Sequence, residues 1–404
     1  MSSVAQSSGG EGGGGAVVQA PAGHSGPRRA SREMILLLCV LSLLLLLSFT
    51  AFVSRMYHKK VHVLADQWFD AGERQLQAGD SSAALTDYRN ALVYSPNNTK
   101  FQFHLAEALA AGGHYDQARP YLLVLLSESP GSGEVNLQLA RIAAANNARA
   151  DALRYYQGAI YGEWKDDANS TRWQIRRELC DYLISKGDIN QAIPAVLDLD
   201  ENTPENDPAR LKIVGQLLLQ TMQWMRAQAL YRSLLRVDRY DEEAIAGAGR
   251  AAFELGEFSA AIEDLNRLSP ERRAQADVAP VLETAHRVLA MSPFLAGLTP
   301  QVRAQRTANA LSIAELRAQG CARATGQSLV ETPPRTELQV AYAMSQTMQP
   351  TWDLRDLQKF PDRVDSAMQT AFDIENAVAQ ACGEPQGDNR ALWLLARSRS
   401  AVNR

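Results

Sequence analysis

A spacing of small, large and helix-breaking residues recurs after 34 positions and constrains the fold of this chain more than any other feature. The first copy consists of Gly79, Ala84, Tyr88, Ala91 and Pro96. The second copy has the same offsets and consists of Gly113, Ala118, Leu122, Leu125 and Pro130. A fixed period of this length is typical of repeat proteins, in which each unit buries its apolar face against the next. Apolar residues three and four apart, broken by Gly or Asp, indicate that each unit is a pair of helices.

Six consecutive units share this pattern and resemble the tetratricopeptide repeat family. Each unit has a small residue in both helices. In the first helices these are Gly72, Ala106, Ala140, Cys180, Gly215 and Gly249. In the second helices they are Ala84, Ala118, Ala152, Ala192, Ala227 and Ala261. Small residues allow two helices to approach closely, while large ones such as Trp68 fill the space that remains.

The units also depart from the family pattern in places. Leu125, Leu199, Leu234 and Leu268 are large where the family usually has Ala. Pro194 lies inside a predicted second helix and is expected to kink it, because proline removes a hydrogen bond and clashes with the preceding turn. The resemblance therefore implies an all-α fold, a solenoid of about six helix pairs over residues 66–273, followed by a helical region over residues 274–404.

A charge-free apolar run precedes the repeats. Residues 34–53 hold no charged side chain, and a helix of that length matches a hydrocarbon core of roughly 30 Å. The apolar region of a cleaved signal peptide is shorter, at about 7–15 residues. A lipoprotein is disfavoured because Leu38 precedes Cys39 where a small residue is expected. We predict a disordered tail over residues 1–33, a transmembrane helix over 34–54 and a helical stem over 55–65.

The orientation of this span is nearly balanced by charge. Arg28, Arg29 and Arg32 flank one side, and Arg55, Lys59 and Lys60 flank the other. A short N-terminal tail before a large C-terminal region favours the tail inside and the soluble region outside. The expected location is the inner membrane, with the soluble region in the periplasm or an equivalent extracytoplasmic space.

The resemblance also implies a binding surface. In this family certain first-helix positions line the inner face of the solenoid. The residues at these positions are Phe69, Glu73, Phe103, Glu107, Leu137, Arg141, Arg177, Asp181, Lys212, Gln216, Ala246 and Arg250. Phe69 and Phe103 are either exposed anchors for a partner or packed against the stem. Chaperone-binding members place Lys and Asn where this chain has Phe69 and Glu73, so it does not resemble that subclass.

The C-terminal third lacks the period but still has helical patterning. Thr299 is a candidate N-cap with Pro300 at the first helical position. Further helices are expected over about residues 334–348, 361–382 and 389–402. They either cap the solenoid or form a separate interaction module. The region resembles, more weakly, the tails of bacterial membrane-anchored tetratricopeptide repeat proteins.

The chain has four cysteines, and their positions predict different chemical states. Cys321 and Cys382 each end a predicted helix and could form a disulfide if the region lies outside the cytosol. Cys180 fills a small-residue repeat position and is expected to be a buried thiol. A metal site is not expected, because the chain has no paired Cys-x-x-Cys.

Patterns for catalysis and cofactor binding are weak. The run from Gly247 to Ala252 has the form of a dinucleotide loop but follows a helix start instead of a strand. The net charge of −4 argues against nucleic-acid binding, which needs a basic surface. We therefore expect no enzyme and no cofactor, but a membrane-anchored scaffold that binds one or more proteins. The alternatives are a self-assembling structural protein, and an enzyme with an unrecognised site in the C-terminal region.

Overall fold

The computed structural model describes residues 28–165, 167–386 and 389–402. Their regular structure is helical, with one isolated β-bridge between Ser132 and Glu163. Most of the predicted disordered tail lies outside the described residues, and the first helix begins at Arg28 instead of residue 34. The chain divides into two compact units, residues 1–122 and 123–404, which are described separately here.

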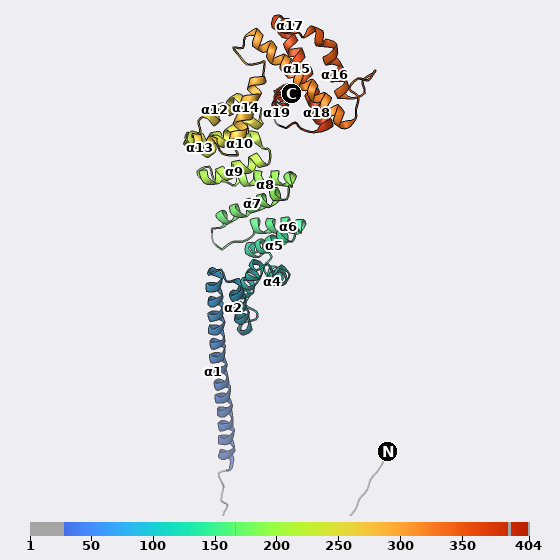
Figure 1. Ribbon diagram of the computed structural model, residues 1–404. Helices are drawn as coiled ribbons and strands as arrows, with labels where there is room; N and C mark the ends of the chain where they lie inside the picture. The colour runs from blue at the N-terminus through green and yellow to red at the C-terminus, as the bar shows by residue number, and fades with distance from the viewer. Residues whose placement is uncertain (1–27, 166, 387–388, 403–404) are drawn as a thin grey trace, which may run out of the picture. The chain divides into compact units, whose positions relative to one another are not determined.

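The first unit contains α1 (Arg28–Gln77), α2 (Ser81–Tyr94), α3 (Thr99–Ala111) and the beginning of α4 (Tyr115–Glu128). The feature that dominates it is the length of α1, a helix of 50 residues that Figure 1 shows in blue. Its apolar part, predicted as a membrane span, continues through the predicted stem into the first repeat helix without a break. The apolar window is long and hydrophobic enough to cross a membrane, and none of it is buried.

The repeats of the first unit pack as the spacing predicts. Tyr88 of α2 is fully buried against α1, and an added Cβ on Gly72 would lie 2.7 Å from its ring. Only Gly allows this approach. Trp68, which the pattern assigns to the core, is instead 36% exposed. No earlier helix pair covers it in the described part of the chain.

The second unit continues the helix pairs. They are α5 (Gly133–Ala145) with α6 (Arg149–Tyr161), α7 (Ala168–Ser185) with α8 (Ile189–Glu201), α9 (Pro208–Gln220) with α10 (Trp224–Val237), and α11 (Glu242–Glu254) with α12 (Phe258–Asn266). Each of these helices contacts the next one along the chain. The prediction of an all-α repeat solenoid is therefore confirmed. Pro194 lies within α8 but does not end it, and Val196 and Leu199 beyond it remain buried.

The remaining helices are α13 (Pro270–Arg273), α14 (Ala279–Met291), α15 (Pro300–Thr325), α16 (Glu337–Met348), a 3₁₀ turn (Gln349–Thr351), α17 (Leu354–Lys359), α18 (Pro361–Cys382) and α19 (Asn389–Val402). Thr299 caps α15 as predicted, since its hydroxyl accepts a hydrogen bond from the Val302 amide. Apart from α13 and the 3₁₀ turn, which have no buried residue, these helices share one hydrophobic core with Phe253 and Phe258 of the last repeat. They thus pack onto the end of the solenoid, so residue 273 does not separate two cores.

Candidate functional site

The residues predicted to bind a partner lie on the first helix of each repeat. These helices begin where their N-cap side chains accept hydrogen bonds from backbone amides in the first turn. The capping residues are Asn98 for α3, Ser132 for α5, Asp167 for α7, Asp207 for α9 and Asp241 for α11. In the second unit we use the name first-helix face for Arg141, Arg177, Asp181, Lys212, Gln216 and Arg250.

Phe69 is not an exposed anchor. Its side chain is 4% exposed, and its ring stacks on Phe101 of α3 with centroids 4.9 Å apart. The 34-residue period does not predict this stacking, because a period within one chain does not show that aromatic rings from two successive first helices meet. Phe103 is half-buried, and its ring is nearly perpendicular to that of His104, with centroids 5.6 Å apart. Of the two predicted anchors, Phe103 alone retains substantial exposure.

His104 joins the two glutamates that the pattern placed in neighbouring repeats. Its Nδ1 lies 3.1 Å from Oε1 of Glu73 and 3.5 Å from Oε2 of Glu107. The hydroxyl of Tyr88 donates a hydrogen bond of 2.5 Å to the same Glu73 oxygen. Burial, together with Glu73, raises the pKa of Tyr88, so its phenol remains a donor. His104 is not one of the positions that the repeat pattern assigns to the inner face, although its place three residues before Glu107 puts both on one helix face.

Arg141 is held by a carboxylate from the next repeat. Its Nε and Nη2 donate hydrogen bonds of 2.9 and 2.8 Å to the two oxygens of Glu178 on α7. The Tyr156 hydroxyl donates to the same carboxylate at 2.9 Å. Burial and the nearby Glu178 raise the pKa of Tyr156. This bidentate pair fixes the direction of the Arg141 side chain on the first-helix face.

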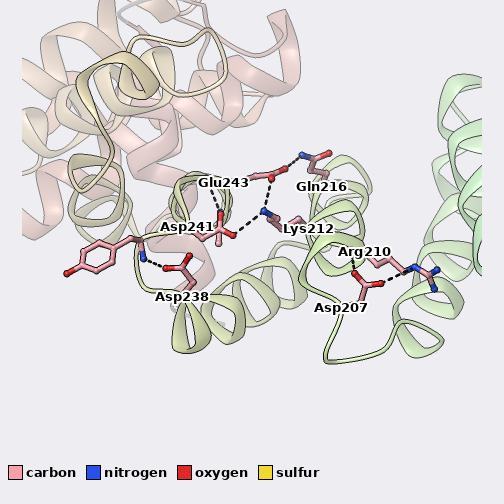
Figure 2. A network of polar contacts seen from close by, with 9 residues as sticks. Asp207, Arg210, Lys212, Gln216, Asp238, Asp241 and Glu243 are labelled. Carbon is pink, nitrogen blue, oxygen red and sulfur yellow. Dashed lines mark hydrogen bonds and ion pairs between the residues drawn. The ribbon is translucent and has the colours of Figure 1, made fainter.

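Lys212 makes a similar connection between α9 and α11, which Figure 2 shows from close by. Its Nζ lies 3.2 Å from Asp241 and 3.3 Å from Glu243, and Gln216 donates a 2.7 Å hydrogen bond to Glu243. Burial opposes protonation, but the hydrogen bonds to both carboxylates prevail and raise the pKa of Lys212. Asp241 therefore has two roles, because it also caps α11.

The other charged positions are also paired. Arg177 lies 3.5 Å from Asp181 one turn further along α7, and burial raises the pKa of Asp181 although Arg177 opposes this. Arg250 lies 3.7 Å from Asp277, whose carboxylate accepts two hydrogen bonds from Arg272. The first-helix face therefore presents charges of both signs that neighbouring groups hold in place.

The C-terminal helices contain the predicted cysteine pair. Cys321 of α15 and Cys382 at the end of α18 are joined by a disulfide, with Cα atoms 5.9 Å apart. Beside it, Arg317 forms an ion pair with Glu375, which is fully buried, and donates a 3.1 Å hydrogen bond to the Gly383 carbonyl. Cys180 is the buried thiol that its repeat position predicts, and burial raises its pKa to about 12.

Two hollows lie along α15. One, of about 490 Å³, is lined by Arg317, Cys321 and the turn after α18, and the other, of about 470 Å³, by Met291, Arg306 and Ile313. Neither brings together carboxylates and histidines in a pattern for acid–base catalysis. Across the described ranges, no group of three or more His, Cys, Asp or Glu side chains is arranged to hold a metal ion.

The helix pairs, the small residues between them and the charged first-helix face define an α-solenoid of the repeat class. Residues 69–133 match the family model for the tetratricopeptide repeat. This part of the chain therefore matches the tetratricopeptide repeat family, and the helix pairs that follow it have the same repeat architecture. No curated protein matches the chain.

Solved structures with similar arrangements share little sequence with this chain. The C-terminal part of a repeat-containing protein from Cytophaga hutchinsonii has 12% identity and a TM-score of 0.40, with 80% of this chain and 99% of that chain covered. Pseudomonas aeruginosa pilF has 14% identity and a TM-score of 0.38, with 55% and 97% covered. PilW, described as a type IV pilus biogenesis factor, has 18% identity and a TM-score of 0.37, with 54% and 98% covered.

Proposed function

We propose that this chain is a membrane-anchored scaffold that binds a protein partner on the first helices of its repeats, within a complex of the cell envelope. The observation that carries the proposal is the continuity of α1. A single helix contains both the apolar segment and the first helix of the repeats. An anchor built in this way would hold the first repeat at a fixed height above the membrane.

The exposure of α1 supports the anchor. Its apolar side chains between Met34 and Val53 are largely exposed, and such a surface is stable in lipid and unfavourable in water. Arg55, Lys59 and Lys60 follow the apolar segment at the level expected for lipid headgroups. The disulfide between Cys321 and Cys382 favours an oxidising compartment for the C-terminal helices, which agrees with the soluble region lying outside the cytosol.

The arrangement of polar groups supports protein binding. Charged side chains such as Arg141 and Lys212 are already oriented by Glu178, Asp241 and Glu243, so little side-chain entropy is lost when a partner binds. Fixed charges of both signs suit an extended or helical segment with a matching charge pattern. We propose no catalytic role, and the partner is defined only as a protein segment of this kind.

Alkaline carbonate extraction and protease accessibility test the anchor and its orientation together. A chain with a C-terminal epitope tag is expected to stay in the membrane pellet, and added protease is expected to remove the tag from spheroplasts. Release into the supernatant would contradict the anchor. Retention with a protected tag would place the repeats in the cytosol and contradict the envelope complex, while leaving the scaffold on the membrane.

A further inference from the structure

One side of α1 carries a stripe of residues at alternating spacings of four and three. We call this stripe the α1 seam. It consists of Leu43, Leu47, Thr50, Ser54, Tyr57, Val61, Leu64 and Trp68. This is the spacing of the contact positions in a left-handed pair of helices, and here it extends from inside the apolar segment to the first repeat.

Beyond the apolar segment, three of the four large seam residues are exposed, and Val61 is partly buried. Tyr57 is 67% exposed, Leu64 is 40% exposed and Trp68 is 36% exposed, although all three are large and mostly apolar. Arg55 and Lys59 lie on the opposite side of the helix, as their spacing from the seam requires. Ala65 and Phe69, which pack inside the first repeats, lie outside the seam and leave Leu64 and Trp68 exposed.

A hollow marks the same side of the helix. It has a volume of about 480 Å³ and is lined by Phe49, Thr50, Val53, Ser54 and Tyr57. It exists because two small seam residues, Thr50 and Ser54, lie between larger neighbours. The Thr50 hydroxyl donates a 2.9 Å hydrogen bond to the Leu47 carbonyl, so it needs no water. Small hydroxyl-bearing residues are typical of positions where two membrane helices approach closely.

We propose that the α1 seam pairs with the α1 seam of a second copy of this chain, in a parallel, in-register dimer. The hollow at Thr50 and Ser54 receives a side chain of the other copy as a knob enters a hole, and Val61, Leu64 and Trp68 meet their counterparts above the membrane. The charges of Arg55 and Lys59 remain on the outer side, where they do not oppose the pairing.

The continuity of α1 identifies a second copy as the occupant. This step rests on the proposed membrane anchor. Two copies inserted in the same direction place every seam residue at the same height, because one rigid helix connects span and stem. A self-complementary stripe then meets itself in register without further adjustment. Confinement to the membrane also raises the effective concentration, which allows a short stem to pair where it would be marginal in free solution.

Disulfide cross-linking in membranes tests the pairing with the full chain. Cys39 is replaced by Ser, and single cysteines are introduced on the seam as Val61→Cys and Leu64→Cys. Matched controls are Lys59→Cys on the opposite side and Val63→Cys, an exposed apolar site off the seam. After mild oxidation and carbonate extraction, the seam variants are expected to give several-fold more dimer than either control.

A second pair of variants tests the hollow. Ser54→Phe fills it and is expected to lower the dimer formed by Val61→Cys, whereas Ser48→Phe adds the same bulk off the seam and leaves the dimer unchanged. Equal cross-linking at seam and control sites in pelleted chains would overturn the dimer while leaving the anchor intact. Chains found in the carbonate supernatant would overturn the anchor and, with it, the register on which the pairing depends.

Discussion

The ring of Tyr231 on α10 lies so close to Gly247 on α11 that a Cβ added to residue 247 would be 2.3 Å from Cζ of the ring. Gly215 of α9 approaches the same ring, with a distance of 2.5 Å from its added Cβ. One tyrosine is thus held between two first helices by the absence of two side chains. This packing explains why the repeat spacing uses small residues opposite large ones.

Gly247→Ala is expected to lower the free energy of unfolding by about 1–3 kcal/mol, because the buried tyrosine has no room to move away. Gly320→Ala on α15 is the matched control. Its added Cβ meets nothing within 4 Å, so the helix should gain about 0.5–1 kcal/mol. Thermal and urea denaturation of the detergent-solubilised chain measure both changes. Equal midpoints for the two variants would show that Tyr231 is not tightly packed.

Phe69 and Phe103, which occupy equivalent repeat positions, should respond differently to truncation. Phe69→Ala removes a buried ring stacked on Phe101 and is expected to lower stability by about 3–5 kcal/mol. Phe103→Ala removes a half-buried ring and should change stability much less while weakening partner binding. Denaturation midpoints of the two variants provide the comparison. A larger loss for Phe103→Ala would contradict the packing of the first two repeats.

The disulfide between Cys321 and Cys382 should stabilise the C-terminal helices, since it closes a loop across a sequence separation of 61 residues. Reduction, or the double variant Cys321→Ser with Cys382→Ser, is expected to lower stability by about 2–4 kcal/mol. Cys39→Ser, outside this core, is the control. The bond itself is checked by maleimide labelling of acid-quenched cells. Labelling of both cysteines without prior reduction would mean that the pair is not oxidised in the cell.

Asp277 should contribute a pH-dependent part of the stability near the last repeat. Two hydrogen bonds from Arg272 lower the pKa of Asp277, so the folded state holds its carboxylate ionised more strongly than the unfolded state does. The contribution is present above about pH 4 and is lost as the pH falls through the lowered folded value.

Asp277→Asn should therefore reduce the loss of stability between about pH 4 and 3. Asp264→Asn is the opposite control, because burial raises the pKa of Asp264 although Arg267 opposes this. Its removal should make the acid loss steeper. Urea midpoints measured across this range distinguish the two, and parallel profiles would contradict the ion pair between Arg272 and Asp277.

The repeat period predicted helix pairs and their buried small residues, because both follow from local spacing. The residues that form the turns between paired helices are less predictable than the helices. Gly79, Gly113, Gly187 and Gly256 have positive φ angles, as the pattern suggests. The equivalent turns of two other repeats use Asn147 and Met222, also with positive φ. Non-glycine residues rarely adopt this conformation, so the sequence alone gave no reason to expect it.

The candidate site was less predictable than the fold. The period assigns Phe69 and Phe103 to equivalent positions, yet only Phe69 is buried, because Phe101 of the next helix lies against it. The period also does not predict the carboxylates that pair with Arg141 and Lys212. Glu178 and Asp241 come from other first helices, and such contacts depend on how the repeats stack.

Site-specific photo-cross-linking in living cells tests the central claim most directly, namely that the first helices bind a protein. A photoreactive amino acid is placed at Phe103 and Gln216 on first helices, and at Val93 and Met225, which are exposed on second helices. The account predicts one discrete adduct of the same added mass from both first-helix sites and none from the second-helix sites. Equal labelling of all four sites, or adducts from Val93 and Met225 alone, would contradict it.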